Sequence, residues 1–182
     1  DYTPLFYELS EEDKEDQKAA FGKFKGLKQK NPNIPKSQLY IMLAKVRKTS
    51  EEKLPVFREY LEKNPDVLED ALVFVETKEY GHKVQKIIHD HTKSYRTYYG
   101  EDPEETLEAF SNGEIGTLVS SKAISEGIDI KSVKNIILFT SNRSKGTTIQ
   151  RIGRALRTNP DNPGKTANIV DFVVRSDIEK EP

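Results

Sequence analysis

The residues best suited to chemistry lie in the segment 147–157, which reads Thr-Thr-Ile-Gln-Arg-Ile-Gly-Arg-Ala-Leu-Arg. On a helical wheel of about 100° per residue, Gln150, Arg154 and Arg157 fall within about 60° of one another. The apolar side chains of the segment fall on nearly the opposite side, where they would dock a helix onto a protein core. Guanidinium groups suit phosphate oxygens, both to bind them and to stabilise the charge that develops during phosphoryl transfer. The segment therefore predicts a phosphate site.

A purely structural explanation of the same residues stays open. Thr147 and Gln150 have the spacing of a helix capping box, which would leave Gln150 with a structural role only. A run of basic side chains is also most often a solvated face. The arginines have no acidic partner within their own stretch, because Ile130 to Pro160 contains seven basic residues and no Asp or Glu. The residues alone therefore leave a phosphate site and a solvated helix as alternatives.

A second candidate segment, 120–129, reads Ser-Ser-Lys-Ala-Ile-Ser-Glu-Gly-Ile-Asp. Gly127 would allow a ligand to approach the backbone closely, and the carboxylate of Asp129 could accept hydrogen bonds from ribose hydroxyls. Ser121 suits a contact with a nucleic-acid phosphate. Each of these residues also has an ordinary explanation, since glycine, aspartate and serine are common in turns.

The elements that must position these segments are indicated by short β-prone runs in the second part of the chain. Such runs predict strands at 71–75, 95–99, 117–119, 135–139 and 168–173, with helical spacing between most of them. Most of the runs are apolar throughout rather than alternating, which indicates strands buried on both faces of a parallel sheet. We therefore predict an α/β fold with an open, mostly parallel sheet flanked by helices. Ligands bind such sheets at the carboxyl ends of the strands, and both candidate segments follow a predicted strand.

The first part of the chain predicts helices instead. Ser10, with Asp13 three residues later, resembles a helix N-cap with an acidic first turn, and Asn31–Asn33 is expected to end that helix. Two further helices are predicted at 37–47 and 50–63. These predictions place a polar, helical segment in front of the sheet.

The composition of the chain changes near residue 70. Residues 1–70 carry 13 basic and 14 acidic side chains, whereas the remainder is more apolar. This change predicts a helical linker or accessory segment at 1–69, followed by the α/β domain at 70–182. The whole chain of 182 residues has a net charge of −1, which speaks against a general polyanion-binding protein.

The composition also excludes several classes of protein. The chain has no cysteine, so it has neither a disulfide framework nor a thiolate metal site. It has no apolar run near the roughly 20 residues that span a bilayer and no signal peptide, so we expect a cytoplasmic or nucleoid-associated protein without a membrane partner. The three histidines do not form a ligand set, so no metal site is predicted in this chain. The chain begins at Asp1 without a methionine and is expected to be a piece of a longer protein.

Taken together, the candidate segments resemble a known family. The spacing Gln150-x-x-Gly153-Arg154-x-x-Arg157 resembles motif VI of superfamily 2 helicases. The stretch 118–129 resembles motif V, 72–75 resembles the strand that carries motif IV, and 99–114 resembles the segment leading into motif V. The similarity covers residues 70–173 in order. The Glu-Gly-Ile-Asp variant of motif V favours the DNA repair and restriction-type translocases of that superfamily.

The resemblance implies a role for each candidate residue around ATP. Arg154 and Arg157 would be arginine fingers on the γ-phosphate, with Gln150 beside that phosphate or its attacking water. Gly127 and Asp129 would contact the nucleotide, Asp129 through the ribose. The fold implied is RecA-like.

The resemblance also implies partners. Ser121 would hold a phosphate of a nucleic-acid strand, which we expect to belong to duplex DNA. The printed sequence contains no Gly-x-x-x-x-Gly-Lys-Ser/Thr and no Asp-Glu pair after an apolar strand. A first motor domain would therefore supply the phosphate-binding loop and most of the Mg²⁺ site. The chain would be the C-terminal motor domain of an ATP-dependent helicase or translocase, inactive in isolation.

Two other functions stay open from the sequence. One is a nucleic-acid-binding or scaffold module that keeps the helicase fold without hydrolysis, although the intact Arg154, Arg157 and Asp129 speak against it. The other is an RNA helicase domain of the same fold. The sequence also departs from the family at Glu104-Glu105, where many relatives have an arginine, so no contact is implied there.

Overall fold

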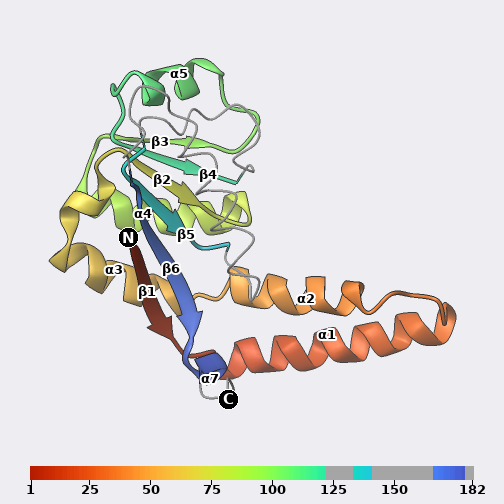
Figure 1. Cartoon of the computed structure of the whole chain (residues 1–182). Coiled ribbons are helices and arrows are strands. Elements are labelled where there is room, and N and C mark those ends of the chain that lie inside the picture. Colours follow the sequence, from red (N-terminus) through yellow and green to blue (C-terminus); the bar gives the residue numbers. More distant parts are fainter. Residues whose placement is uncertain (122–132, 141–165, 179–182) are drawn as a thin grey trace.

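The computed structural model contains one six-stranded sheet in which every strand runs parallel to its neighbours (Figure 1). It describes residues 1–121, 133–140 and 166–178. The strand order is β1-β6-β5-β2-β4-β3. The strands are β1 (Tyr2–Tyr7), β2 (Ala71–Phe74), β3 (Tyr95–Tyr98), β4 (Thr117–Ser120), β5 (Asn135–Leu138) and β6 (Asn168–Val174). The predicted α/β class with an open parallel sheet is confirmed, and within the described residues the sheet is wholly parallel.

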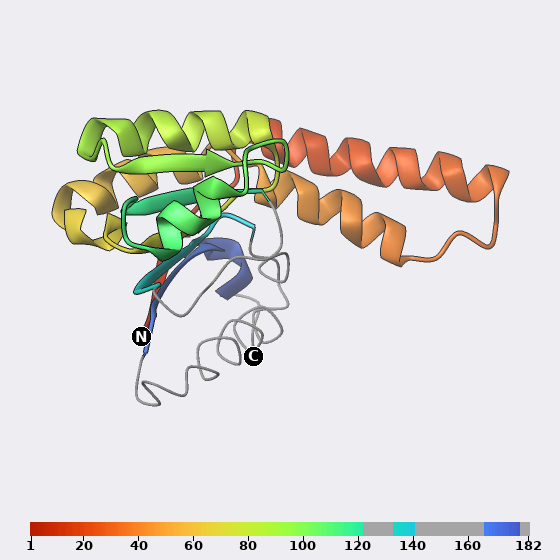
Figure 2. The same ribbon diagram turned by 90° about the horizontal axis from the view of Figure 1, so that it is seen from above.

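Helices lie on both faces of this sheet (Figure 2). The helices of the described residues are α1 (Glu11–Lys30), α2 (Ser37–Lys48), α3 (Lys53–Lys63), α4 (Lys78–His91), α5 (Glu105–Ser111) and α7 (Arg175–Ile178), with a 3₁₀ turn at Pro65–Leu68. The helices predicted at 37–47 and 50–63 are therefore present with slightly different ends. α3 and α4 pack on one face, and α5 packs on the other.

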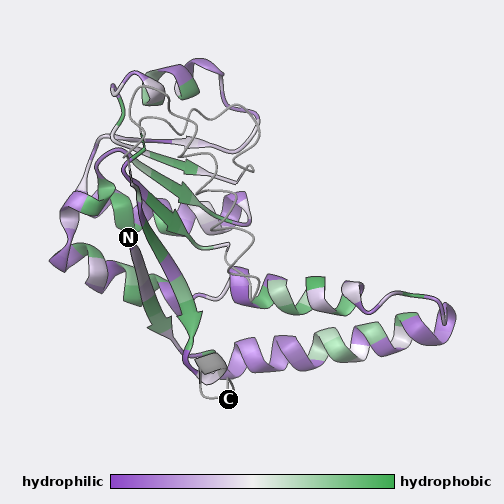
Figure 3. Ribbon diagram, in the orientation of Figure 1, coloured by the Kyte–Doolittle hydropathy of each residue, from purple (hydrophilic) through white to green (hydrophobic). Residues whose placement is uncertain are grey.

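The core forms because alternate residues of each central strand point to opposite faces of the sheet. Val73, Val119 and Ile137 face α3 and α4, and all three are fully buried. Leu72 and Leu118 face α5 and are equally buried. Burial on both faces explains why these strands are apolar throughout, as the sequence predicted (Figure 3).

Strand β1 was not predicted, because the sequence indicated only helices before residue 70. It pairs in parallel with β6 from Tyr2 opposite Ile169 to Tyr7 opposite Val174. β1 is one of the two edge strands, and its residues are mostly half-exposed. An edge position also tolerates a proline, which lacks the backbone N–H needed in a central strand. The division of the chain at residue 70 stays a prediction, but β1 and α3 pack in the same sheet and core as the later residues.

Helices α1 and α2 form an antiparallel hairpin that projects away from the sheet (Figures 1 and 2). Helix α1 begins with the predicted cap: the Ser10 hydroxyl accepts from the Asp13 backbone N–H at 3.0 Å, and the Asp13 carboxylate accepts from the Ser10 N–H at 3.2 Å. Phe24 on α1 and Ala44 on α2 are the buried apolar residues of the two helices. We call residues 11–48 the hairpin.

Candidate functional site

The carboxyl ends of the central strands form the edge at which a ligand of such a sheet would bind. Phe74 at the end of β2 pairs with Ser120 of β4 on one side and with Leu138 of β5 on the other. The chain reaches residue 122 directly after β4 and residue 141 directly after β5. Both sequence-predicted segments therefore leave the sheet at this one edge.

Ser121 is the predicted site residue that the structure describes. It follows the last residue of β4 and is half-buried. The backbone N–H of Val75 donates to the Ser120 carbonyl at 2.9 Å, which fixes the end of β4 against the end of β2. Ser121 therefore lies at the carboxyl edge, where the sequence placed it, and its contact with a nucleic-acid phosphate stays a prediction.

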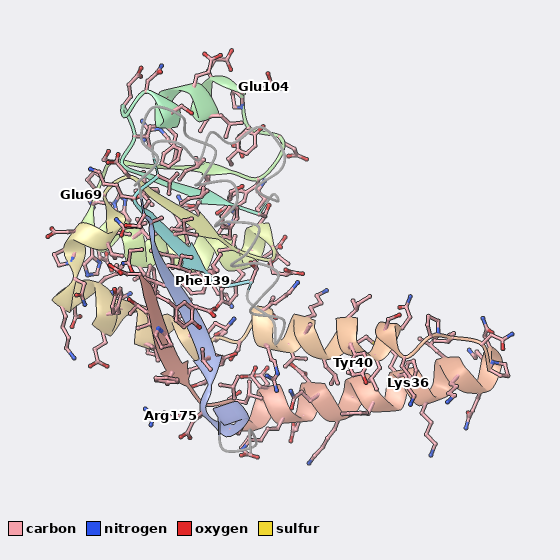
Figure 4. All side chains as sticks on the ribbon, viewed as in Figure 1. Lys36, Tyr40, Glu69, Glu104, Phe139 and Arg175 are labelled. Atoms are coloured by element: carbon pink, nitrogen blue, oxygen red, sulfur yellow. The ribbon has the colours of Figure 1, made fainter. Side chains whose placement is uncertain are left out.

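The other predicted site residues lie outside the described residues. They are Gly127, Asp129, Gln150, Arg154 and Arg157. The structure fixes only the points at which their segments leave and rejoin the sheet. The acidic pair Glu104-Glu105, in contrast, is described: it is exposed at the start of α5, and Figure 4 shows Glu104 on the part of the molecule far from the hairpin.

Helix α4 and the hairpin also meet the carboxyl edge. Thr77 caps α4, and its hydroxyl accepts from the Tyr80 N–H at 3.1 Å. One residue earlier, Glu76 forms an ion pair of 3.1 Å with Lys48, the last residue of α2. The base of the hairpin is therefore attached beside the edge from which the candidate segments leave.

A buried lysine that the sequence analysis did not single out lies under this edge. Lys53, the first residue of α3, is 1% exposed. Its ammonium group donates to the carbonyl of Phe139, the residue after β5, at 2.8 Å (Phe139 is labelled in Figure 4). The same nitrogen lies 5.5 Å from the ring centroid of Tyr7 and 5.9 Å from that of Phe172, within the range of cation–π attraction. Lys53 therefore joins α3 to the end of β5, eight residues before the segment 147–157 that carries the arginines.

The surroundings of Lys53 change its acidity. Burial penalises the charged form and lowers the pKa of its ammonium group to about 7. The carboxylates of Asp171, Asp13 and Glu76 oppose this by favouring the charged form. Asp171 is itself buried, and one of its oxygens accepts a hydrogen bond of 2.9 Å from the Tyr2 hydroxyl on β1.

Hydrogen bonds connect the hairpin to the same region. The hydroxyl of Ser50 donates to the Asp13 carboxylate at 2.6 Å, and the Tyr80 hydroxyl donates to the Ser50 carbonyl at 2.7 Å. Burial, with the nearby Tyr7 and Asp13, raises the pKa of the Tyr80 hydroxyl. The start of α1, the turn before α3 and helix α4 are thus held together by buried polar contacts. We call Asp13, Ser50, Lys53 and Tyr80 the junction cluster.

A signal for Lys53 was present in the sequence. Lys53, Phe57 and Leu61 are spaced by four residues, so on a helix they share one stripe, and the other two are apolar. All three prove to be fully buried. A lysine on an apolar stripe indicates a buried charge, but its partner Phe139 is distant in sequence and could not be found by spacing.

Two kinds of feature are absent from the part of the chain that the structure describes. No three histidine or carboxylate side chains there gather closely enough to hold a metal ion. In the same ranges, no helix combines the length and apolar character needed to cross a bilayer.

The fold and its carboxyl edge define the class of protein. A parallel sheet in this order, with helices on both faces, is the RecA-like α/β fold that solved helicase-type C-terminal domains share. The sequence profile described as the helicase conserved C-terminal domain matches residues 52–159, more than half of the chain. The chain belongs to the family of helicase C-terminal domains. The match includes helix α3, in agreement with its place in the core.

Individual relatives agree with this assignment. The chain is 27% identical over 126 residues to the DNA 3'-5' translocase XPB2 of Sulfurisphaera tokodaii, which covers 69% of the chain and 27% of that protein. The C-terminal domain of the Sulfolobus solfataricus SWI2/SNF2 ATPase is similar with a TM-score of 0.60 and 16% identity, over 98% of the chain and 83% of that domain. The core of the same ATPase in complex with dsDNA has a TM-score of 0.63 and 15% identity, over 95% of the chain and 40% of that core. These solved structures support the fold, and the chain spans about 27% of the translocase's length.

Proposed function

We propose that this chain is the second motor domain of an ATP-driven translocase or helicase acting on duplex DNA. The observation that carries the proposal is the shared carboxyl edge of β4 and β5, from which both motif segments leave. A nucleotide bound at such an edge can be reached by residues of both segments at once. The proposal therefore joins the two candidate segments in one ATP site.

In this proposal the arginines act on the transferred phosphate. Arg154 and Arg157 lie on the segment after β5, and guanidinium groups stabilise the charge that develops on the γ-phosphate. Gln150 would be placed beside that phosphate or the water that attacks it. Gly127 and Asp129 would hold the nucleotide, Asp129 by accepting hydrogen bonds from the ribose.

The remainder of the ATP site would come from a first motor domain. The printed sequence contains no phosphate-binding loop, and the described residues contain no metal-binding group. A partner domain would supply the loop and most of the Mg²⁺ ligands. ATP would then bind between the two domains, and this chain alone would not hydrolyse it.

Duplex DNA is the proposed nucleic acid. The relatives that support it are a DNA translocase and an ATPase core in complex with dsDNA. Ser121 is the proposed phosphate contact, because it is half-buried at the edge where the motif V segment begins. We place the protein in the cytoplasm or on the nucleoid.

ATP hydrolysis tests the arginine roles. In a protein that joins this chain to a P-loop motor domain, Arg154→Ala is expected to lower DNA-stimulated hydrolysis by about 10³-fold or more. Arg58→Ala is the matched control, because it also removes a guanidinium, from an exposed ion pair with Asp90. That control should hydrolyse ATP at close to the wild-type rate.

Three outcomes separate the proposal from its alternatives. Wild-type hydrolysis by Arg154→Ala would contradict the arginine-finger role. A joined protein that binds duplex DNA but never hydrolyses ATP would be a scaffold instead. Stronger stimulation of hydrolysis by RNA than by duplex DNA would assign the RNA helicase function.

A further inference from the structure

The hairpin carries a large local charge that the net charge of the molecule conceals. Residues 17–50 contain nine basic side chains and no acidic one, whereas the other 148 residues contain 20 basic and 30 acidic side chains. All residues of this basic segment belong to the described part of the chain. They form most of α1 and all of α2, the part of the molecule that extends beyond the sheet (Figure 2).

Most of these charges are open to a partner. Seven of the nine are exposed lysines, and none of the seven forms an ion pair within the described ranges: Lys18, Lys23, Lys25, Lys28, Lys30, Lys36 and Lys45. Lys48, at the base, is paired with Glu76. Like charges gathered on one thin arm repel one another, so a polyanion bound there would relieve the repulsion.

Part of this charge lies along a single face of α1. Lys18, Phe21, Lys25 and Lys28 are spaced by three, four and three residues, which places them on one stripe of the helix. Phe21, in the middle of the stripe, is 53% exposed. Lys18 and Lys28 are about 15 Å apart along the axis, and one strand of B-DNA presents a phosphate about every 3.4 Å. The stripe can therefore reach several phosphates.

Helix α2 also exposes apolar side chains. Tyr40 and Ile41 on α2 are 63% and 64% exposed, and Figure 4 shows Lys36 and Tyr40 on the part of the hairpin away from the sheet. Aromatic side chains among lysines suit contact with nucleic acid, where they pack on bases or sugars. The two helices thus present lysines and exposed aromatic rings together.

We propose that the α1–α2 hairpin is a second nucleic-acid-binding arm that holds the phosphate backbone of duplex DNA. The choice of duplex DNA rests on the proposed function, because the base of the hairpin is fixed beside the edge where Ser121 lies, through the ion pair of Lys48 with Glu76. DNA that contacts this edge would pass near the arm.

Other polyanions fit these residues less well. Protein–protein interfaces are depleted in lysine and enriched in arginine, whereas the exposed basic side chains of the hairpin are lysines. A helix that lies on an anionic membrane presents a broad apolar face, whereas Phe24 of α1 is buried and lies inside the hairpin fold. Phosphates spaced along a duplex match a row of point charges.

The test measures DNA binding by the 182-residue chain without ATP. The triple variant Lys18→Gln, Lys25→Gln, Lys28→Gln removes three charges from the stripe and keeps good helix formers. A matched control, Lys63→Gln, Lys86→Gln, Lys93→Gln, removes three exposed charges from α3, α4 and the residues after α4. Circular dichroism of both variants establishes that the helices are retained.

The expected result is a weaker and less salt-dependent complex. Binding of a labelled duplex should fall at least about tenfold in the stripe variant, and the slope of log K against log[salt] should decrease in magnitude by up to about 2.7 for three lost phosphate contacts. The control should bind like the wild type, with the same slope. Equal affinity and slope in the stripe variant would overturn the proposal.

Companion ligands identify any other partner. If the wild-type chain binds folded RNA, anionic vesicles or an acidic polypeptide through the same three lysines and does not bind duplex DNA, the proposal is wrong in its ligand. Because the measurement contains no ATP, loss of hydrolysis in the joined protein would overturn the proposed function and leave the arm intact. Equal DNA binding by the stripe variant and the wild type would, in turn, overturn the arm and leave the effect of Arg154→Ala on ATP hydrolysis unchanged.

Discussion

At the scale of single residues, Lys53 shows how the fold changes a charge state. A lysine exposed to water has a pKa of 10.5, and burial lowers that of Lys53 to about 7. Between these two values the unfolded chain holds a proton that the folded chain lacks. Stability must therefore rise with pH across this window, and the cost of the buried charge is greatest below about pH 7.

The first prediction concerns this window. Lys53→Met keeps the length of the side chain and removes its titration. As the pH is raised from about 7 to about 10, the melting temperature of the wild-type chain should increase relative to that of Lys53→Met. Lys86→Met, at an exposed position, serves as the control and should follow the wild-type curve. Parallel curves for wild type and Lys53→Met would contradict a lowered pKa.

The second prediction concerns Asp13, whose carboxylate both caps α1 and accepts the Ser50 hydroxyl. Asp13→Ala removes the carboxylate half of the capping box and leaves the buried Ser50 hydroxyl without its acceptor, so it should lower the free energy of unfolding by about 1–3 kcal/mol. Asp16→Ala, an exposed change on the same helix, should stay within about 0.5 kcal/mol of wild type. Urea denaturation measures the free energy of unfolding of both variants and of the wild type.

At the scale of elements, the sequence predicted well those strands whose two faces are both buried. β2, β4, β5 and β6 are short apolar runs because neighbours cover them on both sides. β1 could not be recognised in this way, since its edge position leaves most of its residues half-exposed. Local pattern therefore reveals the central strands, and of the two edge strands it found β3 and missed β1.

The same difference between local and long-range contacts decides which parts of the candidate site could be predicted from the sequence. Ser121 could be placed from sequence because it directly follows a recognisable strand. The junction cluster could not, because Asp13, Ser50, Lys53 and Tyr80 meet only after folding. The basic hairpin was concealed for a simpler reason: counting over residues 1–70 averaged its charge with the acidic residues on either side.

The third prediction concerns the stability of the hairpin as an element. Phe24 and Ala44 are the buried apolar residues of its two helices, so the arm has little core of its own. Its amides beyond the junction cluster should exchange with solvent faster than those of β2 and β4. Hydrogen exchange followed by mass spectrometry measures both. Equal protection in hairpin and sheet would show that the hairpin unfolds only with the whole molecule.

At the scale of the whole molecule, helix α3 packs in the core of the sheet domain although it precedes residue 70. Phe57 of α3 is fully buried, and its ring lies 5.1 Å from that of Phe139 and 6.3 Å from that of Phe172. These partners stand at the end of β5 and within β6. The core would therefore lose an aromatic cluster if α3 were removed.

The fourth prediction follows from that cluster. Phe57→Ala should lower the free energy of unfolding of the entire chain by about 3–5 kcal/mol. Phe24→Ala, which empties the hairpin instead, should increase exchange in α1 and α2 while the sheet keeps its stability. Thermal unfolding measures the loss of global stability in Phe57→Ala, and hydrogen exchange measures the local opening of the hairpin in Phe24→Ala. A Phe57→Ala chain that melts like the wild type would place α3 outside the cooperative unit.

The pairing of β1 with β6 has a mechanical consequence. The strands are parallel and adjacent, and their register runs from Tyr2 opposite Ile169 to Tyr7 opposite Val174. A pull on the start of β1 and on the end of β6 acts in opposite directions along the same ribbon, as their positions in Figure 1 show. All hydrogen bonds of the pair then carry the load together instead of opening one after another. The border of the sheet is thus arranged to resist shear, which would suit the force-transmitting role of the proposed translocase.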